Sequence, residues 1–255
     1  MQKIVLIGGG TGVSELLAAF RKVRSSEVVA VTTVFDNGGS SGVLRKKFGI
    51  PAVGDFRRCV SATAGPISKF FEKRLPIGHA LGNLALVELV RELGFEKATQ
   101  IFSKFAEAAV LPVSFSNSQL VGKLESGAKI RGENKFDHPP QKFKNEKIVG
   151  ISLQPGAKLN PQIKKLLKQA DKIVLGPGSL FGSLLVHFAV AGFTAAFKQS
   201  RAQKILVLPA TREFGYRNEG ASEIAARFPV EFDQVLRPTK GSKKWNSVSL
   251  IRKIV

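Results

Sequence analysis

The sequence is poor in the residues that cross-link small folds. Cys59 is the single cysteine, so no disulfide can form within the chain, and the three scattered histidines do not supply a structural zinc cluster. One cysteine is typical of a reducing compartment, and the apolar run at residues 4–7 is too short for a signal peptide. We therefore expect a cytoplasmic protein.

Acidic residues are also scarce. The 19 Asp and Glu residues stand against 39 Lys and Arg residues, and the resulting net charge of +20 favours anionic ligands. The cations are spread along the chain, so the charge is equally consistent with a solvated surface. The sequence has no helix-turn-helix signature, aromatic-rich RNA-binding strand or clustered basic helix, and we expect no specific nucleic-acid partner.

Long apolar runs are absent with one exception. Residues 173–197 contain no Asp, Glu, Lys or Arg and are long enough to cross a bilayer. Gly176, Pro177 and Gly178 interrupt this stretch near its start, which favours a strand, a tight turn and a buried helix. We therefore expect no membrane span.

The remaining composition predicts a globular α/β protein. Hydrophobic residues make up 44% and charged residues 23% of the 255 residues, as in typical soluble domains. A buried strand at residues 3–7, a glycine-rich turn, an amphipathic helix and a second buried strand at residues 28–34 form a βαβ unit. Further helices are predicted at residues 55–63, 81–93, 97–108, 161–170, 179–191 and 219–228, and further strands at residues 148–153, 172–175, 205–208 and 232–236.

This order predicts a single domain over residues 1–255. Its framework is a doubly wound, mostly parallel Rossmann-like sheet. Residues 110–147 are predicted to form a small antiparallel β insertion, because short apolar segments are punctuated there by glycines. Residues 237–255 form a basic tail, and its apolar run at residues 248–251 is predicted to be an edge strand.

A glycine-rich turn follows the first strand. Residues 8–12 let the backbone approach a phosphate closely, while the following helix N-terminus supplies free amides and positive potential. The turn is not a Walker A loop, and it is not a complete G-x-G-x-x-G fingerprint because Val13 holds the place of the last glycine. A tight turn without a ligand is the alternative.

A second turn, at residues 36–42, follows the second strand. Asp36 could accept hydrogen bonds from ribose hydroxyls, which keeps an NAD dehydrogenase open as a lower-ranked alternative. The glycines and serines behind it form another amide-rich concavity, although a simple hairpin turn at Asn37-Gly38 is the alternative. Two such concavities indicate a ligand with a long phosphorylated body.

Three further positions could complete one crevice at the strand ends. Asp55 either caps its helix or joins Asp36 around a cation such as Mg²⁺, with Arg57 or Arg58 neutralising phosphate charge. His79 and Asn83 lie together at a helix start, where a lone histidine is more often structural. Residues 176–179 form another turn between a strand and a helix, with Ser179 as cap or phosphate donor.

These segments occur in the same order in a known family. Over residues 1 to about 200, the chain resembles the gluconeogenesis factor family of bacterial proteins that bind UDP-N-acetylglucosamine. That family is similar to the 2-phospho-L-lactate transferases of coenzyme F420 biosynthesis. The matching segments are Gly8-Gly9-Gly10-Thr11-Gly12, Asp36-Asn37-Gly38-Gly39-Ser40-Ser41-Gly42, Gly54-Asp55-Phe56-Arg57, Gly78-His79-Ala80-Leu81-Gly82-Asn83 and Gly176-Pro177-Gly178-Ser179-Leu180-Phe181.

The resemblance implies a Rossmann-like core, a cytoplasmic location and binding of a nucleotide diphosphate sugar. It also implies a role in cell shape and wall-precursor allocation during growth on gluconeogenic carbon sources. In the transferases, a divalent cation is held by carboxylates that match Asp36 and Asp55. The leading expectation is a UDP-sugar-binding regulator with an unidentified protein partner, and a homo-oligomer is open. The alternative is a Mg²⁺-dependent phospho-transferase.

The sequence departs from the family pattern in two places. Asn37 replaces the second of two aspartates, and a neutral amide holds a cation less well. Residues 209–217 replace the usual run at the sugar and base end of the site, where Tyr216 could stack on a base and Arg217 could pair with phosphate. The candidate ligand-binding residues are Gly9, Gly10, Thr11, Gly12, Asp36, Asn37, Gly38, Gly39, Ser40, Ser41, Arg57, His79, Asn83, Gly176, Gly178, Ser179, Tyr216 and Arg217, and the candidate metal ligands are Asp36 and Asp55.

Overall fold

Six strands form one parallel sheet in the order β3-β2-β1-β7-β8-β9. The structure is a computed structural model that describes residues 1–23, 26–209, 214–216, 219–237 and 245–255. The doubly wound α/β fold predicted from the sequence is confirmed. The strands are β1 Gln2–Gly8, β2 Ser26–Thr32, β3 Ala109–Pro112, β7 Lys172–Leu175, β8 Gln203–Val207 and β9 Gln234–Leu236.

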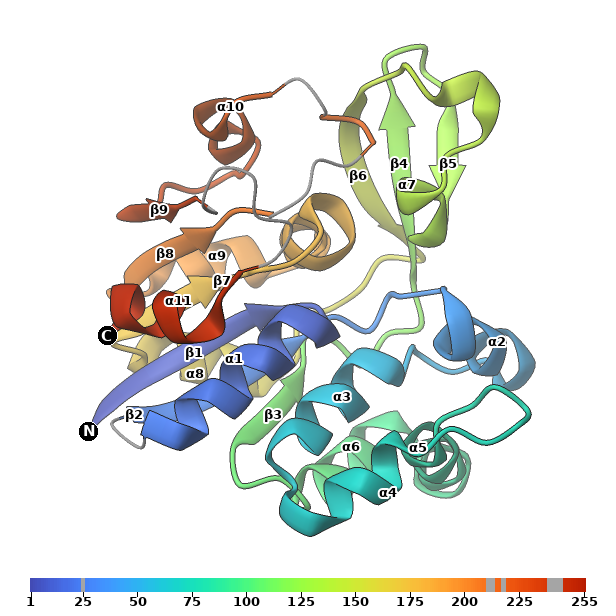
Figure 1. The fold of residues 1–255 in the computed structure, drawn as a ribbon. Coiled ribbons are helices and arrows are strands. Elements are labelled where there is room, and N and C mark those ends of the chain that lie inside the picture. The colour runs from blue at the N-terminus through green and yellow to red at the C-terminus, as the bar shows by residue number, and fades with distance from the viewer. Residues whose placement is uncertain (24–25, 210–213, 217–218, 238–244) are drawn as a thin grey trace.

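Strand β1 lies at the centre of this sheet. Residues 4–7 are fully buried, because β2 and β7 pair with β1 on its two edges and helices cover both faces (Figure 1). The chain runs from β1 through β2 to β3 on one side, then returns to β7 and continues through β8 to β9 on the other. The strand order reverses at β1, and doubly wound sheets bind ligands beyond the strand carboxyl ends at such a point.

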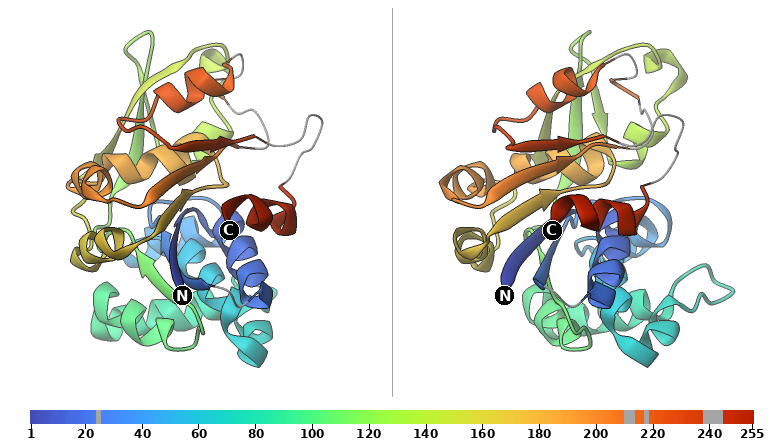
Figure 2. Two further views of the ribbon diagram at one scale, coloured as in Figure 1. Left: turned by 90° about the vertical axis from the view of Figure 1, so that its left-hand side faces the viewer. Right: turned by 60° about the vertical axis from the view of Figure 1, so that its left-hand side comes forward.

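Helices cover both faces of the sheet. α1 Gly10–Val23 and α11 Ser247–Ile254 pack together on one face, and α8 Pro161–Gln169 and α9 Phe193–Gln199 pack together on the other (Figure 2). Within the described ranges, no helix is long and apolar enough to cross a membrane. The other helical segments are α2 Gly39–Phe48, α3 Gly54–Thr63, α4 Ser68–Glu72, α5 Leu81–Leu93, α6 Phe95–Ser103, α10 Ala221–Ala226 and short turns at Gly65–Ile67 and Gln141–Phe143.

A smaller antiparallel sheet stands beside the carboxyl ends of the large one (Figure 1). Its strands β4 Gln119–Leu124, β5 Lys129–Arg131 and β6 Ile148–Gln154 have the order β5-β4-β6. The short helix α7 Asn134–Asp137 follows β5, and its Phe136 ring packs over Gly122, where a Cβ atom would lie 2.9 Å from the ring. This packing joins α7 to the sheet.

Several local elements differ from the sequence-based expectation. Residues 110–112, expected at the start of the insertion, belong to β3 of the large sheet, whereas the strand expected at residues 148–153 pairs with β4 in the small sheet. The edge strand predicted at residues 248–251 is wrong: this run lies in α11, whose apolar residues form one buried face at helical spacing. The single helix predicted at residues 179–191 is a π-helical turn followed by a 3₁₀ segment.

Candidate functional site

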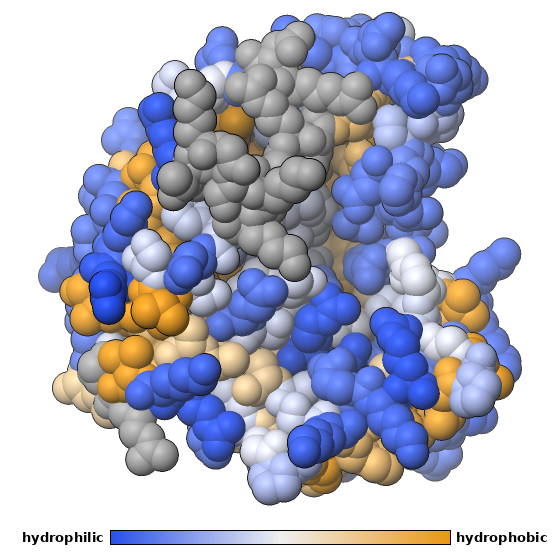
Figure 3. Space-filling model, in the orientation of Figure 1, coloured by the Kyte–Doolittle hydropathy of each residue, from blue (hydrophilic) through white to orange (hydrophobic). Residues whose placement is uncertain are grey.

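A cleft of about 420 Å³ opens at the carboxyl ends of β1, β2 and β7, where the strand order reverses. It lies between the small sheet and α2, and hydrophilic residues surround this hollow in the space-filling view (Figure 3). Its lining comes from segments that are far apart in the sequence. We call the turns at residues 9–12, 36–41, 54–58 and 178–179 the floor of the cleft, and residues 132–137, which follow β5 of the small sheet, the wall.

Three helices begin at the floor. The first residues of α1, α2 and α3 are Gly10, Gly39 and Gly54. Amides in the first turn of a helix have no intrahelical acceptor and carry partial positive charge. Neither α2 nor α3 has a side-chain cap, so their first-turn amides can donate to an anionic ligand. Convergence of three helix N-termini makes the floor suitable for phosphate groups.

Close backbone packing joins the floor turns into one surface. A Cβ atom at Gly12 would lie 2.0 Å from the carbonyl oxygen of Pro177, and one at Gly10 would lie 2.5 Å from Oδ1 of Asp55. Neither gap admits a methyl group. The glycines predicted to bring a phosphate close to the backbone thus also bring the turns of β1, β7 and α3 into contact.

Carboxylates from the floor and the wall face the same cleft. Burial raises the pKa of Asp55 to about 7, with a further contribution from Asp36, while Arg58 opposes the shift. Burial and the charge of Asp36 also raise the pKa of Glu133 well above its usual range, and burial raises that of Asp137. The acidic groups crowd one another, which favours partners that supply positive charge or hydroxyl donors.

A chain of polar contacts supports the floor from behind. Arg57 is 2% exposed and forms an ion pair with Glu72. Its Nε donates to Oδ1 of Asn83 (3.0 Å), and Nδ2 of Asn83 donates to Oγ of Ser40 (3.0 Å). The Ser40 hydroxyl also lies 2.9 Å from Nδ1 of His79. The network fixes the starts of α2, α3 and α5 relative to one another.

A second buried arginine, Arg45 of α2, fixes the turn that carries Asp36. Its Nη1 donates to the carbonyl oxygen of Phe35 (3.1 Å), and its Nε donates to Oδ1 of Asn117 (3.0 Å). Nη2 of the same side chain donates to the carbonyl of Ser118. The guanidinium therefore ties the end of β2 to the loop that leads into the small sheet.

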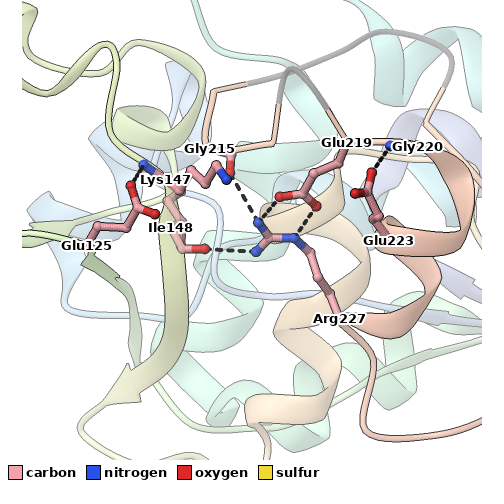
Figure 4. Close-up of polar contacts among 8 residues, drawn as sticks. All are labelled: Glu125, Lys147, Ile148, Gly215, Glu219, Gly220, Glu223 and Arg227. Carbon is pink, nitrogen blue, oxygen red and sulfur yellow. Dashed lines mark hydrogen bonds and ion pairs between the residues drawn. The ribbon is translucent and has the colours of Figure 1, made fainter.

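The C-terminal part of the chain is fastened to the small sheet by Arg227 (Figure 4). This side chain pairs with Glu219, and its Nη1 donates to the carbonyl of Ile148 in β6 (2.8 Å). The guanidinium also lies 5.6 Å from the ring centroid of Phe181. Phe181 is the neighbour of Gly182, which lines the cleft. Arg227 therefore supports this part of the lining from outside the cleft.

Most residues predicted from the sequence meet in this cleft. They come from all four floor turns and from α5, so the structure brings together motifs that lie up to 170 positions apart in the chain. That they bind a ligand stays a prediction. The predicted residues that line the cleft are Gly9, Gly10, Thr11, Gly12, Asp36, Gly38, Gly39, Ser40, Ser41, Asp55, Arg57, Asn83, Gly178 and Ser179.

Three predicted residues lie behind the lining. The side chain of Asn37 points to the wall, where its Oδ1 accepts a hydrogen bond from the Asn134 amide (2.8 Å). His79 reaches the cleft only through the hydroxyl of Ser40. Gly176 has a positive φ of 100° and donates its N–H to the carbonyl of Ile7 (2.8 Å), so it shapes the turn rather than the surface.

Tyr216 and Arg217 are the two residues predicted at the sugar and base end of the site. Tyr216 is 2% exposed, and its ring centroid lies 5.9 Å from that of Phe181. A ring buried in this way has no free face for a base, so the structure does not support the predicted stacking role. Arg217 lies outside the described residues.

The sequence does not predict the cleft residues that lie outside the glycine-rich motifs. The wall was read only as part of a β insertion, although its acidic residue Glu133 directly follows a glycine, as the floor's Asp55 does. The place of the wall depends on how the small sheet docks, which no local pattern encodes. The missed lining residues are Arg74, Glu133, Asn134, Asp137, Gly182 and Ser183.

A cation at this site would need ligands from outside the protein. In the part of the chain that the structure describes, no three His, Cys, Asp or Glu side chains are close enough to hold a metal ion. Mg²⁺ commonly takes only one or two protein carboxylates together with phosphate oxygens and waters. Asp36 and Asp55, which share the floor, are suited to that arrangement.

Two curated proteins similar to this chain carry the same name. The Thermotoga maritima protein named "Putative gluconeogenesis factor" is 36% identical over 80% of this chain and 67% of its own length. An Aquifex aeolicus protein of the same name is 38% identical over 80% of this chain and 66% of its own. The chain thus spans about two thirds of the length of these relatives.

Solved structures and a family match agree with these relatives. A UPF0052-family protein from Bacillus halodurans superposes with a TM-score of 0.81 at 30% identity, covering 92% of this chain and 80% of its own. Residues 4–228 match the family described as 2-phospho-L-lactate transferase CofD. The chain therefore belongs to the CofD family, together with proteins named gluconeogenesis factor.

Proposed function

We propose that this chain binds a nucleotide diphosphate sugar of the UDP-N-acetylglucosamine type in the cleft and acts as a regulator. The observation that carries the proposal is the convergence of the α1, α2 and α3 N-termini on one floor. A pyrophosphate offers adjacent anionic groups to several sets of helix amides at once. Arg58 and Arg74, which also line the cleft, add positive charge beside them.

The groups opposite the floor suit the sugar and ribose parts of such a ligand. Glu133 and Asp137 supply carboxyl oxygens and Asn134 supplies an amide, all from the wall. Sugar hydroxyls donate to carboxylates and accept from amides, so these side chains match a hydroxyl-rich group better than a second phosphate. The ligand would therefore place its phosphates on the floor and its hydroxyls against the wall.

Mg²⁺ is compatible with this arrangement and is part of the proposal. Asp36 and Asp55 would hold it, since the crowding that helps to raise the pKa of Asp55 to about 7 would be relieved by a nearby cation. When bound there, the ion would neutralise charge between the carboxylates and the ligand phosphates. Arg57 and the floor amides would still orient the phosphates from the protein side.

Calorimetric titration of the purified protein tests the proposal. We expect binding of UDP-N-acetylglucosamine with and without Mg²⁺, without turnover, and weaker binding of GDP and NAD⁺. A matched variant, Gly12→Ala, should lose most of this binding because its Cβ would lie 2.0 Å from the Pro177 carbonyl oxygen. Mg²⁺-dependent GDP binding without UDP-sugar binding would contradict the proposal.

A second candidate is a Mg²⁺-dependent phospho-transferase, favoured by the meeting of Asp36 and Asp55 in one cleft. The variant Asp36→Asn separates the two functions. A transferase should lose turnover of its nucleotide donor, whereas a regulator should lose only part of its affinity. If Asp36→Asn binds normally and no donor is consumed by the unmodified protein, the transferase proposal fails.

The resemblance to proteins named gluconeogenesis factor leads to a second part of the proposal, the role of the protein in the cell. We infer that ligand binding is passed to an unidentified protein partner in the cytoplasm and that it adjusts cell shape and wall-precursor supply during gluconeogenic growth. A strain lacking the protein should then grow normally on glucose and show altered shape on a gluconeogenic carbon source. Equal growth and shape on both carbon sources would contradict this role.

A further inference from the structure

Asn37 connects the floor to the wall. Its Oδ1 accepts a hydrogen bond from the backbone N–H of Asn134 (2.8 Å), the first residue of α7. On the other side of the amide, a Cβ atom at Gly132 would lie 2.0 Å from Nδ2 of Asn37. Gly132 has a positive φ of 91°, so this close approach needs both the conformation and the size of glycine.

The backbone that carries Asn37 is held on its own side. A Cβ atom at Gly42 of α2 would lie 1.9 Å from the carbonyl oxygen of Asn37, so the turn and the helix are in tight contact. The carbonyl of Phe35, two residues earlier, accepts a hydrogen bond from the buried Arg45 (3.1 Å). Asn37 therefore extends from a fixed turn to the wall.

The remaining wall contacts lead to a different part of the molecule. The ring centroid of Phe136 lies 5.8 Å from that of Phe181, and a Cβ atom at Gly182 would lie 2.6 Å from Oε1 of Glu133. Both partners belong to the segment after β7. These contacts hold the wall to the half of the cleft that follows β7, whereas Asn37 holds it to the half that follows β2.

We propose that Asn37 is a positioning residue: its amide sets the distance between the wall and the floor, and through it the affinity for the ligand group that reaches Glu133, Asn134 and Asp137. The inference rests on the proposed function and assigns the sugar end of the ligand to the wall. It also gives the amide a role other than that of a replaced metal ligand. An aspartate at this position could accept the same hydrogen bond.

The test compares two probes that reach different distances into the cleft. Inorganic pyrophosphate needs only the floor, whereas UDP-N-acetylglucosamine also needs the wall. We expect Asn37→Ala to weaken UDP-N-acetylglucosamine binding about tenfold, the equivalent of one lost hydrogen bond, and to change pyrophosphate binding less than about twofold. Asn37→Asp should restore the ratio of the two affinities, because its carboxylate still accepts from the Asn134 amide.

A matched control comes from the other side of the molecule. Asn246 accepts a hydrogen bond from the backbone N–H of Ser249 (3.0 Å) at the start of α11. Asn246→Ala removes the same kind of contact without touching the cleft, and it should leave both affinities unchanged. An equal loss for both probes in Asn37→Ala would mean general destabilisation and would overturn the proposal.

Hydrogen exchange tests the contact without any ligand. Asn37→Ala should speed exchange of the Asn134 amide at least about tenfold, and Gly132→Ala should do the same by forcing the Asn37 amide away. Unchanged exchange in both variants would overturn the positioning role. If the unmodified protein binds no nucleotide sugar but the exchange effect is present, the proposed ligand is wrong while the connection of wall and floor stands.

Discussion

The floor and the wall of the cleft differ in the way they are built. The floor presents backbone amides at the starts of three helices, each placed by a turn in tight contact with the next. The wall presents acidic and amide side chains on a short segment of the small sheet. The comparison teaches that the floor draws positive potential from main-chain amides as well as from arginines, whereas the wall owes its negative charge to side chains held by tertiary contacts.

The largest expected effect comes from replacing Arg227, which holds the C-terminal part of the chain to the small sheet. Arg227→Met should lower the free energy of unfolding by about 3 kcal/mol, because it leaves the Glu219 carboxylate, 15% exposed, without its partner. Chemical denaturation at pH 7 measures this change. The matched control is Arg91→Met, since the Arg91–Glu88 pair is 50% and 60% exposed and should contribute less than about 0.5 kcal/mol.

The Arg227–Glu219 pair also predicts how the stability of the protein changes at acid pH. Arg227 lowers the pKa of Glu219 in the folded state, so the pair's contribution is complete above the usual glutamate pKa of about 4.3. It is lost as the pH falls through the lower, folded-state value. The free-energy difference between the unmodified protein and Arg227→Met should therefore shrink below pH 4. A difference that stays constant down to pH 3 would contradict this account.

The next effect concerns the floor. Gly12→Ala should cost about 2 kcal/mol of stability, because the new methyl group would overlap the Pro177 carbonyl and force two turns apart. The control is Gly150→Ala in β6, where an added Cβ meets no atom within 4 Å and little change is expected. Thermal unfolding of the two variants measures the contrast. Equal shifts would mean that the floor is not closely packed.

The next prediction depends on pH and concerns the crowded carboxylates of the floor and the wall. The folded-state pKa of Asp55, about 7, lies above its usual value of 3.8, so the native state holds a proton that the unfolded chain releases between these limits. Stability should fall as the pH rises through this window. Asp55→Asn removes the penalty and should be more stable by about 1–3 kcal/mol at pH 8.

The measurement for Asp55→Asn is thermal unfolding at pH 4 and pH 8 in the presence of a chelator. The gain should be present at pH 8 and absent near pH 4. Asp171→Asn is the control, because the Asp171 carboxylate accepts from the Lys3 backbone amide at the opposite end of β1. A gain of the same size at both pH values would show that titration of Asp55 is not its cause.

The smallest effect is on the outer face of the small sheet. Lys123 and Lys129 are exposed and stand directly opposite each other in the β4–β5 pair. Lys129→Glu should stabilise the protein by about 0.5 kcal/mol by replacing a repulsion with an attraction, and salt should reduce the gain. Lys129→Gln, which only removes the repulsion, should give a smaller gain. A loss in Lys129→Glu would contradict the assigned register.

The sequence predicts the floor because its information is local. Three of the four floor turns carry their glycines shortly after an apolar strand, so strand, turn and helix can be recognised within about 15 residues. The α5 helix is predicted at residues 81–93 and found at Leu81–Leu93, since Gly94 ends its apolar pattern. Parallel pairing then brings the strand ends, and with them the motifs, to one edge of the sheet.

The wall and the C-terminal segment could not be predicted in the same way. Glu133 and Asp137 reach the cleft because Phe136 and Asn37 fix their segment, and both contacts join residues far apart in the chain. The apolar run at residues 248–251 is too short to separate a strand from a helix. Packing of α11 against α1 decides it, and that choice is tertiary.

The distribution of the cleft along the chain has a consequence for synthesis. Its lining extends from Gly9 in the first turn to Ser183 after β7, with the wall contributed between them. A nascent chain that has not yet emerged beyond residue 183 lacks part of the lining and offers no complete binding surface. A ligand of this cleft can therefore stabilise the protein only after residues 9–183 have emerged from the ribosome, by binding the native state rather than by guiding its assembly.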